Sequence, residues 1–358
     1  MKNIYLEIAD LRSSDIPFVL ATVTGVKGST PQKPGSSAIF GLEGLLFGTV
    51  GGGVLEGEIT KIAKDAIHSK VSGHYYFNLD HDISHEEEAI CGGKISVLVD
   101  ASPFGANNVP IQVKQSLLDR IPGVIITKIT AGENNRVVID RYWVTENQSG
   151  SNPLENSERI KEKVKSLLSE GKPGDFSELE ISIPGEKKKI TYFLEPVFPP
   201  AHLVIAGAGH IGKALAHLGA LLDFEVTVID DRIEYANPGN IPDADHIIVE
   251  DIARAMNELN KKSDTYIVIV TRGHKDDANA LKSCIRSDAG YIGMIGSKNK
   301  IALMQENFIG KGWATREQWK KINAPVGLEI QSKTVQEIAV SIAAQLVLVR
   351  NNKKLSDA

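Results

Sequence analysis

Hydrophobic and polar positions divide the chain into two parts with different patterns. In the first part, short β-rich apolar runs alternate with glycine-containing turns, which is typical of strands. The runs cover residues 18–23, 38–40, 45–50 and 95–99. Leu55, Ile59 and Ala63 recur at helical spacing, so a helix is predicted from residue 54 to about residue 67.

A second helix and a hairpin end this first part. Ile160, Val164 and Leu167 form one apolar stripe after a polar loop over residues 146–158, which predicts an amphipathic helix. Alternating apolar residues before and after the turn at Pro184 and Gly185 then predict a β-hairpin. Prolines at positions 196, 199 and 200 follow and indicate a stiff connector. We place a domain boundary there, between residues 197 and 198.

Beyond the connector, apolar runs alternate regularly with helical stretches. Strands are predicted over residues 203–206, 226–229, 246–249, 266–270 and 291–295, and a long closing helix over 334–350. Such βαβ alternation predicts a parallel sheet covered on both faces. The expected fold is therefore α/β, with an α+β domain over residues 1–197 and a Rossmann-like, doubly wound domain over residues 198–358.

Composition excludes two classes of partner. The chain has 358 residues and a formal net charge of −5, so no domain-wide basic surface is available for nucleic acid. The N-terminal stretch MKNIYLEIADLRSSD carries charges where a signal peptide needs an apolar core, and no run is long enough to span a membrane. With only two cysteines, no disulfide framework is expected, and the predicted location is the cytoplasm.

A glycine-rich loop opens the second domain. Gly207, Gly209 and Gly212 form G-x-G-x-x-G directly between a predicted strand and a predicted helix, the context of a phosphate-binding loop. Asp230 and Asp231 end the next strand, about 20 residues further on, where an acid accepts from a ribose hydroxyl. This loop with its acids is specific for the fold but does not identify the ligand.

Further polar residues follow the strands of this domain. His210 begins the first helix and is either a ligand contact or a solvated cap. Arg272 and His274 follow the fourth strand, where they could hold an anion and transfer a proton, or only cap the next helix. Ser297 can cap the helix after the fifth strand, and Lys298 can reach a phosphate there.

The first domain contains two more glycine turns. Gly51, Gly52 and Gly53 lie between a strand and a helix, where successive backbone N–H groups can form an anion-binding nest. Glu56 follows in the first helical turn, where it could face the ligand or simply complement the helix dipole.

Cys91 precedes the glycine pair Gly92 and Gly93. A thiolate beside exposed N–H groups can react with sulfur species or bind a soft metal, whereas a buried structural cysteine is the alternative. Cys284 lies on an apolar helical stripe and is expected in the core. His81 and His85 are spaced four apart but lack a fuller set of metal ligands.

Together these motifs resemble the XdhC/CoxI family of accessory proteins for molybdenum hydroxylases such as xanthine dehydrogenase. The stretches that carry the resemblance are GSTPQKPG, GTVGGGVLEGE, CGG, PPAHLVIAGAGHIGKAL, VTVIDDR, VTRGHKDD, YIGMIGSKNK and APVGLEI with EIAVSIAAQ. They cover nearly the whole chain. Gln331, Val335 and Gln345 stand where the family pattern leads us to expect Gly, Pro and Glu.

The resemblance implies a cofactor chaperone rather than a catalyst. Its expected role is to bind the molybdenum cofactor, protect it while a sulfur ligand is added, and insert it into an apo molybdenum hydroxylase. A cysteine desulfurase is implied as the sulfur donor, and a homodimer as the assembly. Within the N-terminal XdhC/CoxI-type domain, Cys91 would be the residue that contacts molybdenum.

Two alternatives remain from the residues alone. The glycine loop with Asp230 fits an NAD(P)-dependent oxidoreductase, in which a nicotinamide dinucleotide would be the cofactor. The same loop also fits a regulator that reads a nucleotide without chemistry.

Overall fold

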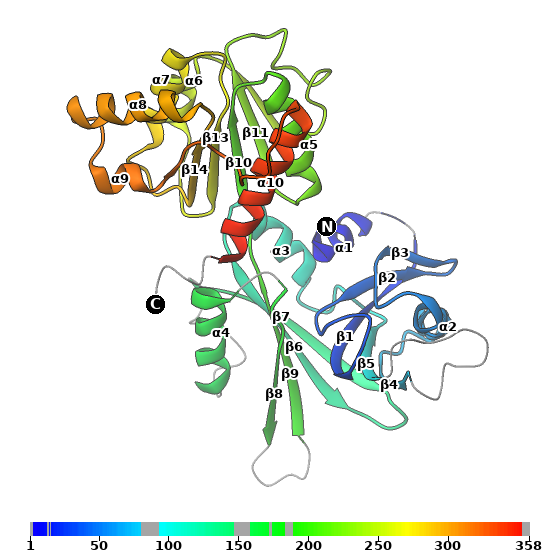
Figure 1. Ribbon diagram of the computed structural model, residues 1–358. Coiled ribbons are helices and arrows are strands. Elements are labelled where there is room, and N and C mark those ends of the chain that lie inside the picture. The colour runs from blue at the N-terminus through cyan, green and yellow to red at the C-terminus, as the bar shows by residue number, and fades with distance from the viewer. Residues whose placement is uncertain are drawn as a thin grey trace. The chain divides into compact units, whose positions relative to one another are not determined.

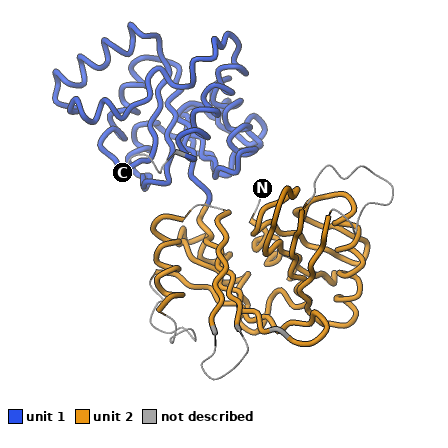
Figure 2. Tube along the Cα trace, turned by 60° about the horizontal axis from the view of Figure 1, so that its bottom comes forward, with its two compact units in different colours: residues 1, 200–358 blue, residues 2–199 orange. Residues whose placement is uncertain are grey.

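The chain forms two compact units in the computed structural model, residues 2–199 and 200–358 (Figure 2). The structure describes residues 3–12, 14, 16–79, 93–146, 158–171, 174–182 and 189–352. The fold class is confirmed: the N-terminal unit is α+β with antiparallel sheets, and the C-terminal unit is a doubly wound parallel sheet.

The N-terminal unit contains two antiparallel sheets. The first has the strand order β3-β2-β1-β5-β4 and the second β7-β6-β9-β8. The strands are β1 (Phe18–Gly28), β2 (Ser37–Gly41), β3 (Gly44–Gly48), β4 (Gly73–Asn78), β5 (Gly93–Asp100), β6 (Gly123–Ala131), β7 (Val137–Thr145), β8 (Ser177–Ser182) and β9 (Lys189–Val197). The helices are α1 (Ile4–Leu11), α2 (Gly53–Ser69), α3 (Val109–Leu118) and α4 (Glu158–Glu170).

Successive side chains of each strand point to opposite faces of its sheet, so the two faces pack against different elements. Val19, Ala21 and Val23 of β1 join the core under α2, whereas Leu20 joins a second core with α1, α3 and strands of the other sheet. On that other sheet, Val124 and Ile126 pack against α4 on the outer face. The two sheets therefore share an inner layer, and each is covered by a helix on its outer face (Figure 1).

The C-terminal unit has one parallel sheet in the order β12-β11-β10-β13-β14-β15. The strands are β10 (His202–Ala206), β11 (Glu225–Asp230), β12 (His246–Val249), β13 (Thr265–Ile269), β14 (Tyr291–Met294) and β15 (Ile322–Asn323). This order reverses direction between β10 and β13, the switch point at which such sheets bind ligands beyond the carboxyl ends of their strands.

Helices cover both faces of this sheet (Figure 1). They are α5 (His210–Leu221), α6 (Ile252–Glu258), α7 (His274–Cys284), α8 (Lys298–Gly310), α9 (Arg316–Lys320) and α10 (Val335–Asn352). One core joins the sheet to α6, α7, α8 and α9, and the other joins it to α5 and α10. The central strands β10, β13 and β14 are thus buried on both faces, as their continuous apolar runs predict, whereas the edge strand β12 is partly exposed.

Several features differ from the sequence expectations. The sequence patterns did not predict the helices α1, α3 and α9 or the strands β4, β7 and β15. Pro196, which we assigned to the connector, lies in β9 opposite Val124. Gln331 has a φ of 60°, the left-handed conformation that explains why glycine would suit this position. Over the ranges given above, none of the helices has the length and apolar character needed to cross a membrane.

Candidate functional site

The glycine loop of the second unit has the shape of a phosphate cradle. Gly207 has a φ of 120°, and a Cβ on it would lie 2.5 Å from the carbonyl oxygen of Val270. A Cβ on Gly212 would lie 1.9 Å from the carbonyl oxygen of Gly207. A Cβ on Gly209, by contrast, would meet nothing within 4 Å. Two glycines are therefore required by packing, and the middle one faces open space.

Backbone donors are available at this open side. The loop amide of Gly207 bonds to Ile229, and the amide of Lys213 begins the intrahelical pattern of α5. Between them, the amides of Gly209, His210 and Ile211 have no hydrogen-bond partner among the described residues. The first amides of a helix, with its dipole behind them, are a favourable site for an anion.

The two acids after β11 have different roles. Asp230 is 2% exposed, and its carboxylate accepts from the amide of Ala208 at 2.8 Å and from the Arg232 side chain at 2.8 and 2.9 Å. Burial alone raises the pKa of Asp230, but these hydrogen bonds outweigh it and hold the pKa below its usual value. Asp230 therefore ties the glycine loop to the second strand. Asp231 is half-exposed and forms ion pairs with Arg272 at 3.0 Å and with Arg232 at 4.0 Å.

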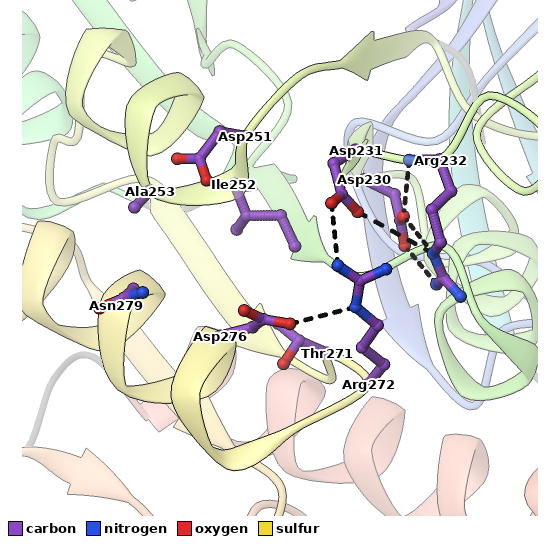
Figure 3. A pocket seen from close by; sticks show the side chains of 10 residues that line it. All are labelled: Asp230, Asp231, Arg232, Asp251, Ile252, Ala253, Thr271, Arg272, Asp276 and Asn279. Carbon is purple, nitrogen blue, oxygen red and sulfur yellow. Dashed lines mark hydrogen bonds and ion pairs between the residues drawn. The ribbon is translucent and has the colours of Figure 1, made fainter.

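Asp231 lines a small open recess beyond the carboxyl ends of the strands (Figure 3). Arg272 lies along one wall of this recess and donates to Asp231 at 3.0 Å and to Asp276 at 3.2 Å. Asp251 and Asn279 lie on the opposite wall. Arg272 is half-exposed, so an incoming anion would have to compete with two carboxylates for its guanidinium.

A buried carboxylate beside this recess was missed by the sequence analysis. Asp277 is 0% exposed, accepts from the Thr271 hydroxyl at 2.6 Å, and pairs with Lys300 at 2.5 Å. It joins the turn after β13 to the first turn of α8. The TRGHKDD stretch showed that an acid is present, but not that Asp276 faces outward and Asp277 inward.

The remaining predicted residues of this unit stay at the surface. Ser297 caps α8 by accepting from the amide of Lys300. His210 and His274 are exposed at the first positions of α5 and α7, and Lys298 is exposed at the start of α8. The structure therefore brings Gly207, Asp230, Asp231 and Arg272 together at one edge of the sheet.

In the first unit, the triple-glycine turn is occupied by the chain's own carboxylate. One oxygen of Glu56 accepts from the Thr49 hydroxyl at 2.6 Å and from the amides of Gly52 and Val50 at 3.1 and 3.2 Å. The amide of Gly51 is bonded to the Thr49 hydroxyl. The turn does form an anion nest, as its glycines predict, but Glu56 is the anion it holds.

The glycine motifs of this unit converge. A Cβ on Gly51 would lie 2.8 Å from the ring of Pro31 in the GSTPQKPG loop. A Cβ on Gly93 would lie 2.5 Å from the carbonyl oxygen of Ser29 in the same loop. Only glycine allows these approaches, so three segments distant in sequence lie side by side. Cys91 and Gly92, as well as His81 and His85, lie outside the described residues.

The prediction for Cys284 is confirmed. It is 1% exposed within the core under α7, and burial raises the pKa of its thiol to about 12. It is therefore a structural residue and not a nucleophile. Across the described ranges, no three His, Cys, Asp or Glu side chains are grouped so that they could hold a metal ion.

Comparison with known proteins gives two family matches. Residues 203–346 match the XdhC Rossmann domain, and residues 11–78 match the XdhC and CoxI family. An uncharacterised protein of Escherichia coli K12, YqeB, is 22% identical over 98% of this chain, but the chain spans only 47% of its length. A protein of Bacillus subtilis 168 named as a probable subunit of xanthine dehydrogenase is 24% identical, with 98% of both chains covered.

A solved structure shares the fold. A crystal structure described as a xanthine dehydrogenase from Bacillus halodurans is 23% identical, with a TM-score of 0.77 and coverage of 99% of this chain and 98% of that one. The two family matches lie one in each unit and include the glycine turn, the phosphate loop and the recess. This chain therefore belongs to the XdhC/CoxI family.

Proposed function

We propose that this protein is an accessory factor of a xanthine dehydrogenase-type molybdenum hydroxylase. It would bind the molybdenum cofactor, protect it during sulfuration and insert it into the apo-enzyme. The observation that carries the proposal is the convergence of the GSTPQKPG loop, the triple-glycine turn and Gly93, two residues after Cys91. Family membership and the names of two similar proteins support the link to xanthine dehydrogenase.

The residues of the second unit fit one part of this cofactor. When bound, the cofactor supplies a phosphate, a polar pterin edge and a metal–sulfur end. The amides of Gly209, His210 and Ile211 would hold the phosphate, because they lie at a helix N-terminus beside an open glycine. The nest amides of Val50 and Gly52 do not fit a second anion, because Glu56 already occupies them.

Retention of molybdenum tests the proposal. Purified protein is mixed with molybdenum cofactor and passed through gel filtration, and molybdenum in the protein peak is measured by mass spectrometry. Wild-type protein should retain it, and Cys91→Ala should retain less or fail to support sulfuration. Cys284→Ala is the matched control, since this thiol is buried in the core. If wild-type protein retains no molybdenum, the proposal is wrong.

Gly209→Ala tests the phosphate cradle separately. Gly209 has φ −69° and ψ −172°, which any residue adopts, and a Cβ there touches no protein atom. The variant should therefore fold normally and retain molybdenum less well, because the methyl group narrows the approach to the free amides. Normal retention of molybdenum by Gly209→Ala would show that the phosphate does not bind at this loop.

The recess favours a nucleotide as the second candidate ligand. Asp231 faces this recess at the switch point of the sheet, where a dinucleotide ribose binds in related folds. An NAD(P)-dependent oxidoreductase would bind NAD or NADP in a calorimetric titration, and absence of binding by both dinucleotides would eliminate it. A nucleotide-sensing regulator would bind a nucleotide without turnover of any substrate.

Partners follow from the same proposal. We expect a homodimer, detectable by light scattering, and complexes with the apo molybdenum hydroxylase and a cysteine desulfurase. Co-elution of these proteins with wild-type protein, and with Gly209→Ala, would show that partner binding does not depend on the phosphate loop.

A further inference from the structure

One face of the first sheet carries two lysines that oppose each other directly. In the register of β1 and β5, Lys27 lies opposite Lys94, and both residues are exposed. The next residue on β5, Ile95, packs in the core under α2, so the lysines point to the other face of the sheet. Like charges in such a pair are destabilising. Within the described part of the chain, no carboxylate pairs with either lysine. A repulsive pair that the fold leaves uncompensated indicates a functional site for an anion.

The lysine pair lies where the glycine motifs of this unit converge. Gly28 follows Lys27 in β1, and it lies opposite Gly93, which precedes Lys94 in β5. A Cβ on Gly93 would lie 2.8 Å from the carbonyl oxygen of Lys27, so the two backbones approach closely at this point. In the sequence, Lys94 follows Cys91 by three residues. The two ammonium groups therefore belong to the same end of the sheet as the GSTPQKPG loop and Gly93.

An exposed aromatic ring lies on the next rung of the same face. Tyr76 of β4 pairs with Ser96, which is two residues from Lys94 on β5 and shares its face. The tyrosine is 72% exposed, more than any other large apolar or aromatic side chain among the described residues. Diagonal neighbours on one sheet face lie about 7–8 Å apart, which long and aromatic side chains can span. One ligand can therefore contact the tyrosine ring and the Lys94 ammonium together.

The tyrosine ring is fixed from one side. His74 packs against it with the ring centroids 4.8 Å apart, and the Tyr76 hydroxyl lies 3.3 Å from His74 Nδ1. The other ring nitrogen of His74 lies 2.8 Å from the hydroxyl of Thr24, which is 3% exposed. Burial lowers the pKa of His74, so its ring is neutral at pH 7 and adds no charge beside the lysines. Tyr76 is thereby oriented in advance, and its other side is available to a flat ligand.

These groups together fit a flat anion. Two ammonium groups attract negative charge, and the exposed ring adds a surface on which another ring can stack. Because Lys27, Lys94 and Tyr76 are all exposed, a ring system can reach them without entering the interior of the sheet. A cation would be repelled, and an aliphatic anion would not use the tyrosine. The net charge of −5 disfavours a long polyanion such as nucleic acid.

We propose that Lys27, Lys94 and Tyr76 form a binding face for a heteroaromatic ring with an anionic group, the ring stacking on Tyr76 and the anion contacting both lysines. Pterins with an acidic substituent and purine nucleotides share this chemistry, and we assign the face to the pterin. This assignment rests on the proposed function, because the cofactor of that function contains a pterin and a thiolate-bearing, negatively charged metal end.

Titration of the full-length protein with pterin-6-carboxylate tests the face without the metal. Binding is followed by pterin fluorescence at pH 7 and low salt, and uncharged pterin and GMP are titrated in parallel. Wild-type protein should bind pterin-6-carboxylate at least fivefold more tightly than pterin. Tighter binding of GMP than of pterin-6-carboxylate would overturn the assignment to a pterin. Absence of binding by both anions overturns the proposal.

Variants locate the binding. The double variant Lys27→Gln/Lys94→Gln should bind pterin-6-carboxylate at least fivefold more weakly and pterin almost unchanged. Tyr76→Leu should weaken the binding of both compounds, whereas Tyr76→Phe keeps the ring and should bind normally. The charge-matched control is Lys61→Gln/Lys64→Gln, since both lysines are exposed on α2, which covers the opposite face. Unchanged affinity in the first double variant or in Tyr76→Leu overturns the proposal.

Two further readouts separate a ligand contact from a structural role. Because the opposed lysines repel each other, Lys27→Gln/Lys94→Gln without ligand should melt at the same temperature as wild-type protein or higher. Raising KCl from about 50 mM to about 500 mM should weaken binding of pterin-6-carboxylate to wild-type protein several-fold, and to the variant much less. A lower melting temperature, or equal salt dependence in the two proteins, contradicts the role of the lysines.

Retention of molybdenum distinguishes this proposal from the proposed function. Lys27→Gln/Lys94→Gln should retain less molybdenum cofactor through gel filtration than wild-type protein does. If wild-type protein retains none, the proposed function is wrong, while the titrations still decide whether the face binds an anionic ring. If wild-type protein and the variant retain equal amounts, the proposed function stands and the assignment of this face to the cofactor is wrong.

Discussion

Glu56 is the residue whose removal should have the largest local effect in the first unit. Its carboxylate accepts from two amides and one hydroxyl of the glycine turn, so Glu56→Ala leaves three donors without their acceptor. We expect a loss of about 1–3 kcal/mol in the free energy of unfolding, measured by urea denaturation.

The matched control is Glu58→Ala, on the same helix. Glu58 forms a surface ion pair with Lys61, an arrangement worth about 0.2–0.5 kcal/mol. Equal losses in the two variants would show that the turn does not depend on Glu56.

Glu195 should make stability depend on pH. Because its pKa is about 7 in the folded protein and near the ordinary 4.5 when unfolded, the folded state binds more protons between these values. The stabilisation is complete below pH 4.5 and is lost as the pH rises through 7, by up to about 3 kcal/mol. Comparing urea denaturation of wild-type protein and Glu195→Gln at pH 5 and pH 8 isolates this effect, since the variant lacks the titrating group. A difference between the two proteins that is the same at both pH values would contradict it.

At the scale of elements, Asp277 links α7 to α8 through Lys300 and holds the turn after β13 through Thr271. Asp277→Ala leaves the Thr271 hydroxyl and the partly exposed Lys300 ammonium without their acceptor and should destabilise the protein by about 1–3 kcal/mol in urea denaturation. Asp276→Ala, one residue earlier and exposed to the recess, should cost less than about 1 kcal/mol. A comparable loss in both variants would refute the link.

Sequence patterns identified the elements that are buried on both faces or strongly amphipathic. The strands β10 to β14 and the helix α10 were predicted close to their observed bounds, because their apolar runs are long and punctuated by glycine and acidic residues. The short helices α1 and α3 were not predicted, because neither is long enough for an apolar repeat to extend over more than three helical turns. Helix α1 depends on a cap that the pattern search overlooked, the Asn3 side chain accepting from the amide of Tyr5.

At the scale of the whole molecule, each unit has cores of its own. The cores of residues 200–352 lie on both faces of one sheet, and those of the first unit lie among its two sheets and four described helices. Residues 200–352 expressed alone should therefore unfold cooperatively in a calorimetric scan. A soluble product without a transition would show that the unit needs residues 2–199.

The candidate sites could be predicted only in part from the sequence, because some of them are formed by segments that come together only in the whole fold. The glycine loops were recognisable because a tight turn requires glycine at fixed spacings. The pocket between the two sheets of the N-terminal unit, lined by Thr22, Thr127 and Arg141, was not recognisable, because its residues come from strands far apart in sequence. Strand β9 pairs with β6, and Asp100 of one sheet forms an ion pair with Arg141 of the other. An arginine or threonine within an alternating strand looks like an ordinary solvent-facing residue until the pairing is known.

The occupied glycine turn has a consequence for selectivity. Glu56 is covalently attached beside its three donors, so it acts as a resident competitor with a high effective concentration at the turn. Ordinary anions are thereby kept out of the turn. A ligand could displace Glu56 only by making further contacts nearby, and in doing so it would release a carboxylate next to the GSTPQKPG loop.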